Sequence, residues 1–402
     1  MRMLHYLRNS PYLFFFPIGI FGAALGGALW LEQPPVLALL WHKELMISGF
    51  LLPIATGFLL TNLHRFLHRG GQPPGIAIVL GFLVWVLGLF GAFLFQARLI
   101  FLALNAGLIS GLIAYAFSRG LLVALPRLRI APFLIAGLLL GLSGSLMRLF
   151  VALGLVPSFW EGLGVQCFHH GFFWLLICGF GQAMFPMLTL STMRPDRLRV
   201  WRQRLQASAR TAPLVAFGLA ASFVSAHDSL LPFALGLRAV LLLFVAWNGW
   251  MLFDRSGRRG VVTFFLKASL LTAVFGHFIL PFFPEYFVHL SHIGLLAGFG
   301  LVTMVVVGRV YLSRVGAVAA ELRAFWFAGA FSVLHLALWT RVTAFLLRSY
   351  WIHIQIAALL WLFGLGLWCA GLFWTLVRAR QGPRSPGDSS KRSGQVRSVS
   401  SV

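Results

Sequence analysis

Acidic residues are scarce in this chain, with nine Asp and Glu among 402 residues. Hydrolytic and nucleotide-dependent enzymes rely on recognisable motifs, and the sequence contains no P-loop, no dinucleotide fingerprint and no nucleophile elbow. Cysteine is rarer still, because Cys167, Cys178 and Cys369 are the only ones and form neither C-x-x-C nor C-x-x-C-H. Covalent attachment of haem is therefore excluded, and ordinary hydrolytic or nucleotide chemistry is not expected.

Charged residues make up only 10% of the chain, whereas hydrophobic residues make up 59% and the mean hydropathy is +0.89. A soluble domain could not bury so much apolar surface, so we expect a protein embedded in a lipid bilayer. The apolar runs are about 20 residues long and do not alternate with polar residues, which indicates helices. We predict an all-α, polytopic transmembrane helical bundle of about 12 spans, at 13–31, 36–63, 75–96, 99–117, 130–152, 164–190, 212–227, 231–253, 262–283, 286–312, 324–346 and 353–377.

The spans form one predicted transmembrane domain, residues 1–380. The first apolar run is long, rich in Phe and without a small-residue cleavage site, so it is expected to remain as the first span. After Arg380 the composition changes to Gly, Pro, Ser and basic residues. Such a segment has almost nothing to bury, so residues 381–402 are predicted to be a disordered tail.

Basic residues are distributed unevenly between the two sets of predicted loops. The net charge of +23 could indicate a nucleic-acid partner, but most of the 32 Lys and Arg fall in the loops on the side of the N-terminus. The loops on the opposite side hold only Arg98, Arg148, Arg341 and Arg348. An excess of Lys and Arg in short cytoplasmic loops sets orientation during insertion. We therefore predict that both termini are cytoplasmic and that no nucleic acid is bound.

With this orientation, most of the 12 histidines converge on the outer leaflet. Three of them, His5, His64 and His68, fall on the cytoplasmic side. The remaining nine are His42, His169, His170, His227, His277, His289, His292, His335 and His353. All of these except His335 lie close to the outer end of a span. Ionisable groups at such depth are costly unless they are paired, solvated or ligating, so they mark a candidate functional site.

Imidazole is a ligand that suits both copper and haem iron, and the neutral ring places no charge in the membrane. His289 and His292 are three residues apart and share a helix face. His169 and His170 are adjacent and point about 100° apart, so at most one of them faces a given centre.

The spacing of short motifs favours His170. It precedes Gly179-Phe180-Gly181 by the same interval as His289 precedes Gly298-Phe299-Gly300, which predicts one depth for both histidines. The candidate cofactor ligands are His42, His170, His289 and His292. The wider candidate metal set is His42, His169, His170, His277, His289 and His292.

Simpler roles are open for several of these residues. His227, His277 and His353 could bond lipid headgroups or loop carbonyls at the interface. His335, near the middle of its span, could form a hydrogen bond between helices.

Several motifs are similar to those of the NnrS family. They are Trp41-His42 with Met46 and Gly49-Phe50, Gly57-Phe58-Leu59-Leu60-Thr61, the helix from His292 to Arg309 with Gly300 and Met304, and Pro11-Tyr12-Leu13-Phe14-Phe15-Phe16. The resemblance extends to the expected topology. It implies a multi-pass protein of the bacterial inner (cytoplasmic) membrane that contains haem b and copper and takes part in the nitric oxide response or in detoxification. It leaves open whether the centre is a sensor, a scavenger or a reductase supplied by a respiratory-chain electron donor.

The sequence departs from the family pattern at two places. Where the family reads His-x-His-Glu-Met, this chain reads His42-Lys43-Glu44-Leu45-Met46, so Glu44 replaces the second histidine. Near Pro186, Gln182 stands close to the place of a family arginine. A carboxylate is a poorer copper ligand than imidazole.

Two other classes of function are open at this point. The first is a transporter of a small solute or metal, in which the histidines and Arg238 line a path, with inverted repeats or broken helices as its signature. The second is a metal-free assembly factor for a membrane complex.

Overall fold

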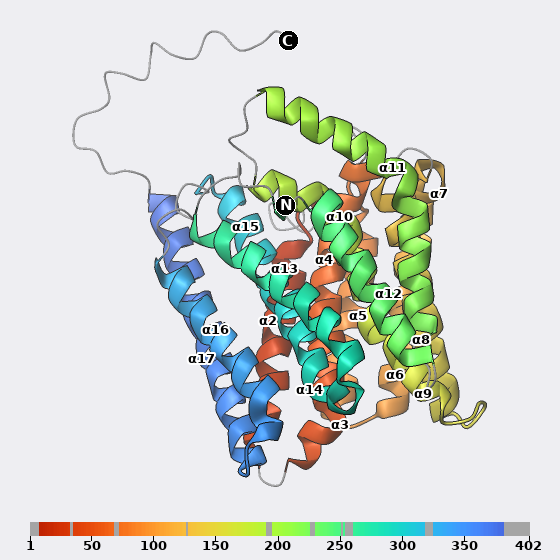
Figure 1. Cartoon of the computed structure of the whole chain (residues 1–402), viewed down its shortest axis with the longest axis vertical. Coiled ribbons are helices and arrows are strands. Elements are labelled where there is room, and N and C mark those ends of the chain that lie inside the picture. The colour runs from red at the N-terminus through yellow and green to blue at the C-terminus, as the bar shows by residue number, and fades with distance from the viewer. Residues whose placement is uncertain are drawn as a thin grey trace.

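The computed structural model describes residues 8–32, 35–67, 72–125, 128–189, 195–225, 230–250, 252–253, 260–317 and 325–381. All regular elements in these ranges are helices, which confirms the predicted all-α bundle (Figure 1). The α-helices are α2 (Tyr12–Ala28), α3 (Val36–Glu44), α4 (Leu52–Leu67), α5 (Ile76–Leu94), α6 (Arg98–Ser118), α7 (Leu121–Ala124), α8 (Ile130–Ala152), α9 (Trp160–Val165), α10 (Phe173–Thr189), α11 (Pro195–Val224), α12 (Leu231–Phe244), α13 (Val261–Ile279), α14 (Phe287–His292), α15 (Val302–Arg314), α16 (Phe325–Thr343) and α17 (Tyr350–Gln381).

Three pairs of these helices are continuous through a π-helical segment. Leu45–Leu51 joins α3 to α4, Gln166–Phe172 joins α9 to α10, and Ile293–Leu301 joins α14 to α15. A shorter π segment, Val245–Gly249, extends α12. Backbone hydrogen bonding is thus rearranged without unwinding the helices, which suits a lipid environment where an unpaired backbone group is costly.

The first of these π segments makes the long second span irregular. Pro53 has no backbone N–H and therefore cannot bond the carbonyl of Gly49, one turn earlier. The π segment Leu45–Leu51 lies at this position. The residues that precede it, His42 among them, consequently face a different direction from the one that a regular helix would give them.

The number of membrane crossings agrees with the prediction of about 12. Eleven helices in the described ranges are long and apolar enough to span a bilayer, and Arg210–Val224 is a shorter apolar stretch. This stretch is the second part of α11, which begins at Pro195 and not at 212 as predicted. Figure 1 shows α11 bending, so that its first part runs across one end of the bundle and its second part descends beside α12.

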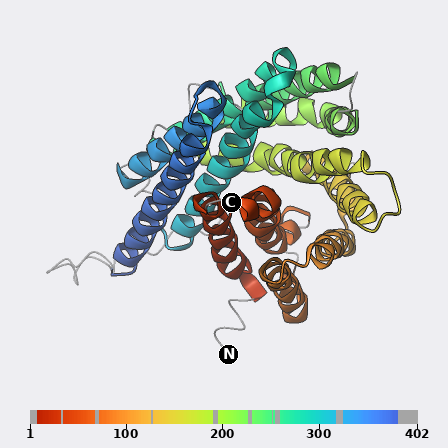
Figure 2. The same cartoon turned by 90° about the horizontal axis from the view of Figure 1, so that it is seen from below.

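The three spans that contain a central π segment form the interior of the bundle. The buried share is 83% for Val36–Leu67, 78% for Trp160–Pro186 and 67% for Pro284–Arg314, against 61% or less for the other long spans. Seen from below, α4 lies near the middle with α2, and the chain passes around them through α8, α12 and α15 to the α16/α17 hairpin (Figure 2). These three interior spans also hold most of the candidate histidines.

The first and last spans place their terminal ends at the same end of the bundle. The ring of Tyr12, at the start of α2, lies 5.8 Å from that of Tyr311 near the end of α15. Tyr311 also lines a cavity together with Leu372 and Leu376 near the end of α17. The start of α2 and the end of α17 therefore lie at one end of the bundle, and the assignment of that end to the cytoplasm stays a prediction. Beyond Gln381, the predicted tail lies outside the described residues.

Candidate cofactor site

Two adjoining cavities lie at the end of the bundle opposite the termini, near α3 and α14 in Figure 1. Their volumes are about 50 Å³ and about 410 Å³. Both are lined by Trp30, His42, Met46, His292, Leu296 and Arg341. We call this joined space the histidine cavity. It brings together His42 from α3 and His292 from α14, two spans that are far apart in the sequence.

Backbone carbonyls orient both of these imidazoles. Nδ1 of His42 lies 2.9 Å from the carbonyl oxygen of Gly26, and Nδ1 of His292 lies 2.6 Å from that of Val288. A carbonyl can only accept a hydrogen bond, so each Nδ1 carries the hydrogen and donates it. The lone pair of each neutral ring is therefore on Nε2. This is the arrangement typical of histidines that bind a metal through Nε2.

A close helix contact supplies the carbonyl that holds His42. A Cβ atom added to Gly22 would lie 2.1 Å from the carbonyl oxygen of Gly49, so α2 can meet the π segment Leu45–Leu51 only because position 22 has no side chain. Gly26 follows one turn later on α2. The contact thus sets the distance between the Gly26 carbonyl and the imidazole of His42.

Two basic side chains line the histidine cavity. Arg341 from α16 is half-buried, and Lys43, next to His42, is exposed. The guanidinium of Arg341 donates a hydrogen bond of 3.1 Å to Nδ1 of His289. His289 also packs against Phe345 and is not among the residues that line the cavity. The structure therefore separates His289 from His292, although both lie on one face of α14.

His169 belongs to a buried ionic network. Arg148 of α8 is fully buried and forms a bidentate ion pair with Glu44 of α3. Its Nε also donates to Glu161 at 3.1 Å, and its Nη1 lies 2.8 Å from Nε2 of His169. Because a guanidinium has no acceptor, His169 accepts this hydrogen bond and its Nε2 lone pair is occupied. Arg98, which is largely exposed, completes the network from the surface through Glu161.

This network gives Glu44 a structural role. The carboxylate of Glu44 is held by Arg148 and does not line the histidine cavity. It serves as a buried counter-ion, and not as a ligand aimed at the site. Sequence reasoning did not identify this role because Arg148 lies 104 residues away. The one signal in the sequence was Arg148 itself. An arginine near the predicted outer end of a membrane span requires a partner.

A second group of buried polar side chains lies beside the cavity. His170 lines the histidine cavity from the π segment Gln166–Phe172, within electrostatic range of His277 and Arg238. Nδ1 of His277 donates to a carbonyl of its own helix at 2.9 Å, which again leaves Nε2 free. Arg238 is buried, lies 3.7 Å above the ring of Phe223 and bonds a backbone carbonyl at 3.0 Å. Both histidines of the adjacent pair line the histidine cavity, and His169 is in addition engaged by Arg148 in the ionic network.

The other candidate histidines lie apart from the cavity. Nδ1 of His335 donates to the carbonyl of Phe331 in its own helix, and His353 bonds Ser349 in the same way. His227, like His5 and His68, lies outside the described residues. Within the part of the chain that is described, no three His, Cys, Asp or Glu side chains gather as a set of metal ligands. The cavity therefore offers pairs of imidazoles, and not a three- or four-ligand metal site.

The equal depth predicted for His170 and His289 is wrong. The ring of Phe299 lies 5.1 Å from that of Trp174, whereas Phe180 contacts Phe58 at 4.9 Å. Phe299 therefore packs at the level of Trp174, and not at that of Phe180. Equal spacing along the sequence does not give equal depth here, because the π segments occupy different positions in the two helices.

One of three comparisons with known proteins found a match. The family model described as NnrS protein matches residues 7–380. Neither a curated protein nor a solved structure matches the chain. The matched range contains every described helix except the last residue of α17, and all of the histidines that line the cavity.

Proposed function

This chain belongs to the NnrS family, and we propose that it is a membrane haem protein of the bacterial nitric oxide response whose histidine cavity binds haem b through His42 and His292. We place it in the inner membrane, where the distribution of basic residues would set its orientation. The observation that carries the proposal is the pair of imidazoles from two interior spans, each held through Nδ1 by a carbonyl with Nε2 free.

The number of available ligands suits haem better than a bare metal ion. Structural zinc and most copper sites need three or four protein ligands, whereas the porphyrin fills four positions on iron and leaves one or two for the protein. His42 and His292 line the same cavity, and no larger ligand set gathers within the described ranges. These two imidazoles would therefore hold a haem better than they would hold a bare metal ion.

The walls of the cavity also suit haem. Trp30, Leu296 and Phe299 provide apolar surface for the macrocycle, and no carboxylate is among the lining residues. Arg341 and Lys43 stand where the two propionates would need cations. When bound, haem would supply an iron centre for nitric oxide, which would take the place of one of the two imidazoles. The chain's own residues would hold the ring, orient the imidazoles and exclude water.

We assign the proposed copper to His170, with His277 as its neighbour. These two imidazoles lie within electrostatic range of each other, and neither is a proposed haem ligand. Two imidazoles leave coordination positions for an external ligand, so this centre would be weaker than the haem site. Turnover would need a respiratory-chain electron donor, whereas sensing or scavenging would not.

An absorption spectrum with iron and copper analysis of the detergent-purified protein tests the proposal. We expect a Soret band and about one iron per chain, with both reduced at least tenfold in His42→Ala and in His292→Ala. His353→Ala is the matched control, because His353 is also a half-buried histidine near the same end but does not line the cavity. It should keep the parent spectrum.

A colourless, iron-free protein that is correctly folded would overturn the haem proposal and favour a transporter or an assembly factor. A Soret band that survives in both alanine variants would overturn the ligand assignment. Copper that is lost in His170→Ala while iron is retained would support the second centre, and copper absent from the parent protein would remove it.

A further inference from the structure

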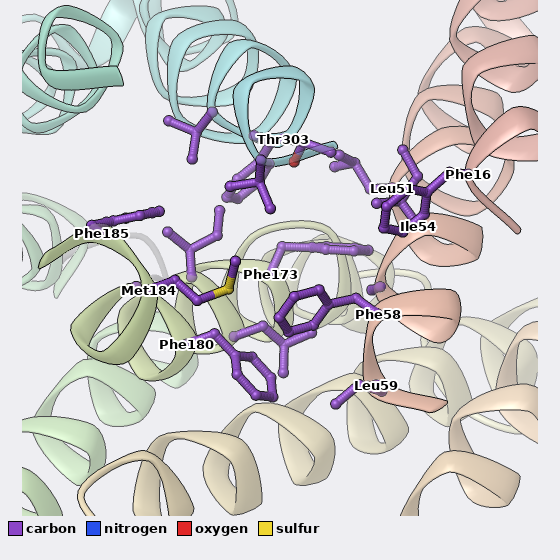
Figure 3. Close-up of a pocket in the computed structure, with 17 residues that line it drawn as sticks. Phe16, Leu51, Ile54, Phe58, Leu59, Phe173, Phe180, Met184, Phe185 and Thr303 are labelled. Carbon is purple, nitrogen blue, oxygen red and sulfur yellow. The ribbon is translucent and has the colours of Figure 1, made fainter. Parts of the chain in front are cut away.

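A separate, almost wholly apolar cavity lies between the histidine cavity and the end of the bundle that holds the termini. Its volume is about 100 Å³, and α2, α4, α10 and α15 with the preceding π segments form its walls. Figure 3 shows the rings of Phe58, Phe173 and Phe180 and the side chains of Met184 and Thr303 surrounding the space. We call it the apolar chamber.

The lining of this chamber excludes charged and strongly polar occupants. Among the described residues that line it, Thr303 provides the only side-chain oxygen, Met184 provides a sulfur, and all other side chains are hydrocarbon. Apolar cavities of this kind stay dry and take up small apolar solutes, because a water molecule would lose its hydrogen bonds inside. An ion would lose its hydration without gaining a partner. Small uncharged gases are therefore the class of occupant that fits.

The chamber is the middle one of three cavities that follow one another along the same helices. It shares Leu51 and Phe299 with the histidine cavity. On its other side it shares Phe58 and Met184 with a polar cavity of about 430 Å³. Each cavity thus shares part of its wall with the next one. The three cavities form a series from the end of the bundle near α3 to the end near Tyr12.

The third cavity differs in character from the chamber. It is lined by Arg65, Arg314, Asn62, Thr61 and Ser10, so water and ions can occupy it. Its position beside Tyr12 places it at the end of the bundle that we predict to be cytoplasmic. The apolar chamber therefore separates the histidine cavity from the third cavity. Uncharged gases can enter it, whereas hydrated ions cannot.

We propose that the apolar chamber is a binding and transit site for small uncharged gas molecules, through which they reach the histidine cavity from the side of Arg65. Nitric oxide as the physiological gas rests on the proposed function, whereas the chamber's preference for apolar gases rests on its lining alone. The filling residue that tests it is Ala55, which lines the chamber and is half-buried.

Xenon is the probe, because it binds dry apolar cavities and can be located by its anomalous scattering in pressurised crystals. The parent protein should show a xenon site between Phe58, Phe173 and Thr303. Ala55→Leu should reduce the occupancy at least fivefold, since the larger side chain fills the space. Ala370→Leu adds the same volume to an exposed position in α17 and should leave the site unchanged.

A parent crystal without xenon in the chamber, or equal occupancy in Ala55→Leu, would overturn the proposal whether or not the protein holds haem. If Ala55→Leu fails to fold, Thr303→Val provides a second test: it removes the one hydroxyl at nearly constant volume and should keep or increase xenon occupancy. Loss of xenon in Thr303→Val would also contradict the proposal.

The transit role needs a second measurement on the haem-loaded protein. After flash photolysis of bound nitric oxide, a fast fraction should rebind from the chamber, and Ala55→Leu should reduce this fraction while Ala370→Leu does not. A xenon site together with unchanged rebinding would refute the transit role and leave the gas-binding role intact. A xenon site in a protein without haem would refute the proposed function and leave the gas site intact.

Discussion

Single residues around the histidine cavity divide into those that can bind a cofactor and those that are already occupied. His42 and His292 have Nδ1 bonded to a carbonyl and Nε2 free, whereas His169 accepts a hydrogen bond from Arg148. The histidines could be placed by depth from the sequence, since depth follows from span boundaries and the distribution of Arg and Lys. Their partners could not, because those lie on other spans.

The first prediction concerns the buried ion pair. Arg148→Ala leaves Glu44 buried without a counter-ion, which should cost about 3–5 kcal/mol of stability. Arg98→Ala removes the exposed member of the network and should cost less than about 1 kcal/mol. Thermal unfolding in detergent measures both effects. Similar midpoints for the two variants would show that Arg148 and Glu44 do not form the pair described here.

At the level of helices, the π segments decide which side chains reach the histidine cavity. A segment such as Leu45–Leu51 rotates the helix before it relative to the helix after it, so the side chains on its two sides point in different directions. Helical periodicity in the sequence predicted the span at 36–63 but not this rotation. The length of this span and Pro53 predicted a tilt, a kink or a late start, and neither feature of the sequence indicated a π segment.

Deletion of one residue from this π segment is the second prediction. Without Ser48 the helix should become regular, which turns α3 by about 100° relative to α4 and moves His42 away from the cavity. Cofactor content should then fall more than tenfold in a protein that still inserts and folds. Deletion of Ala246, in the π segment Val245–Gly249 that lines none of the cavities described above, should leave cofactor content near the parent value. Full retention of haem without Ser48 would contradict the positioning role.

Contact between α2 and the π segment gives the third prediction. Gly22→Ala forces a methyl group against the Gly49 carbonyl, so the helices must separate, at a cost of about 1–3 kcal/mol. The Gly26 carbonyl moves with α2, so cofactor affinity should also fall. Gly81→Ala is the control, because position 81 is exposed and has no atom within 4 Å of an added Cβ. Equal stability and equal cofactor content in the two variants would contradict the close contact.

For the whole molecule, the composition of the sequence was enough to predict an all-α membrane bundle and the approximate number of spans. The two departures have physical reasons. The helix that contains Arg210–Val224 starts earlier than predicted, because its basic first part is helical without being apolar. The packing of three π-containing spans at the centre could not be predicted, since it depends on long-range contacts between glycines and aromatic rings.

The fourth prediction concerns topology. In a chain without the native cysteines, Ser158→Cys and Ser349→Cys should react with a membrane-impermeant thiol reagent added from outside the cell. Ser313→Cys should react only after the membrane is opened. All three positions are exposed, and Ser158 and Ser349 lie on opposite sides of α11 in the sequence, so equal labelling requires α11 to cross the membrane. Labelling of Ser158 but not Ser349 from outside would show that it does not.

The central claim is that Nε2 of His42 and of His292 binds haem iron, and pulsed EPR of the ferric protein with ¹⁵N-labelled histidine tests it most directly. The account predicts hyperfine couplings from two histidine nitrogens at the iron, reduced to one in either single alanine variant. A haem signal without any histidine coupling, or with two couplings still present in His292→Ala, would contradict it.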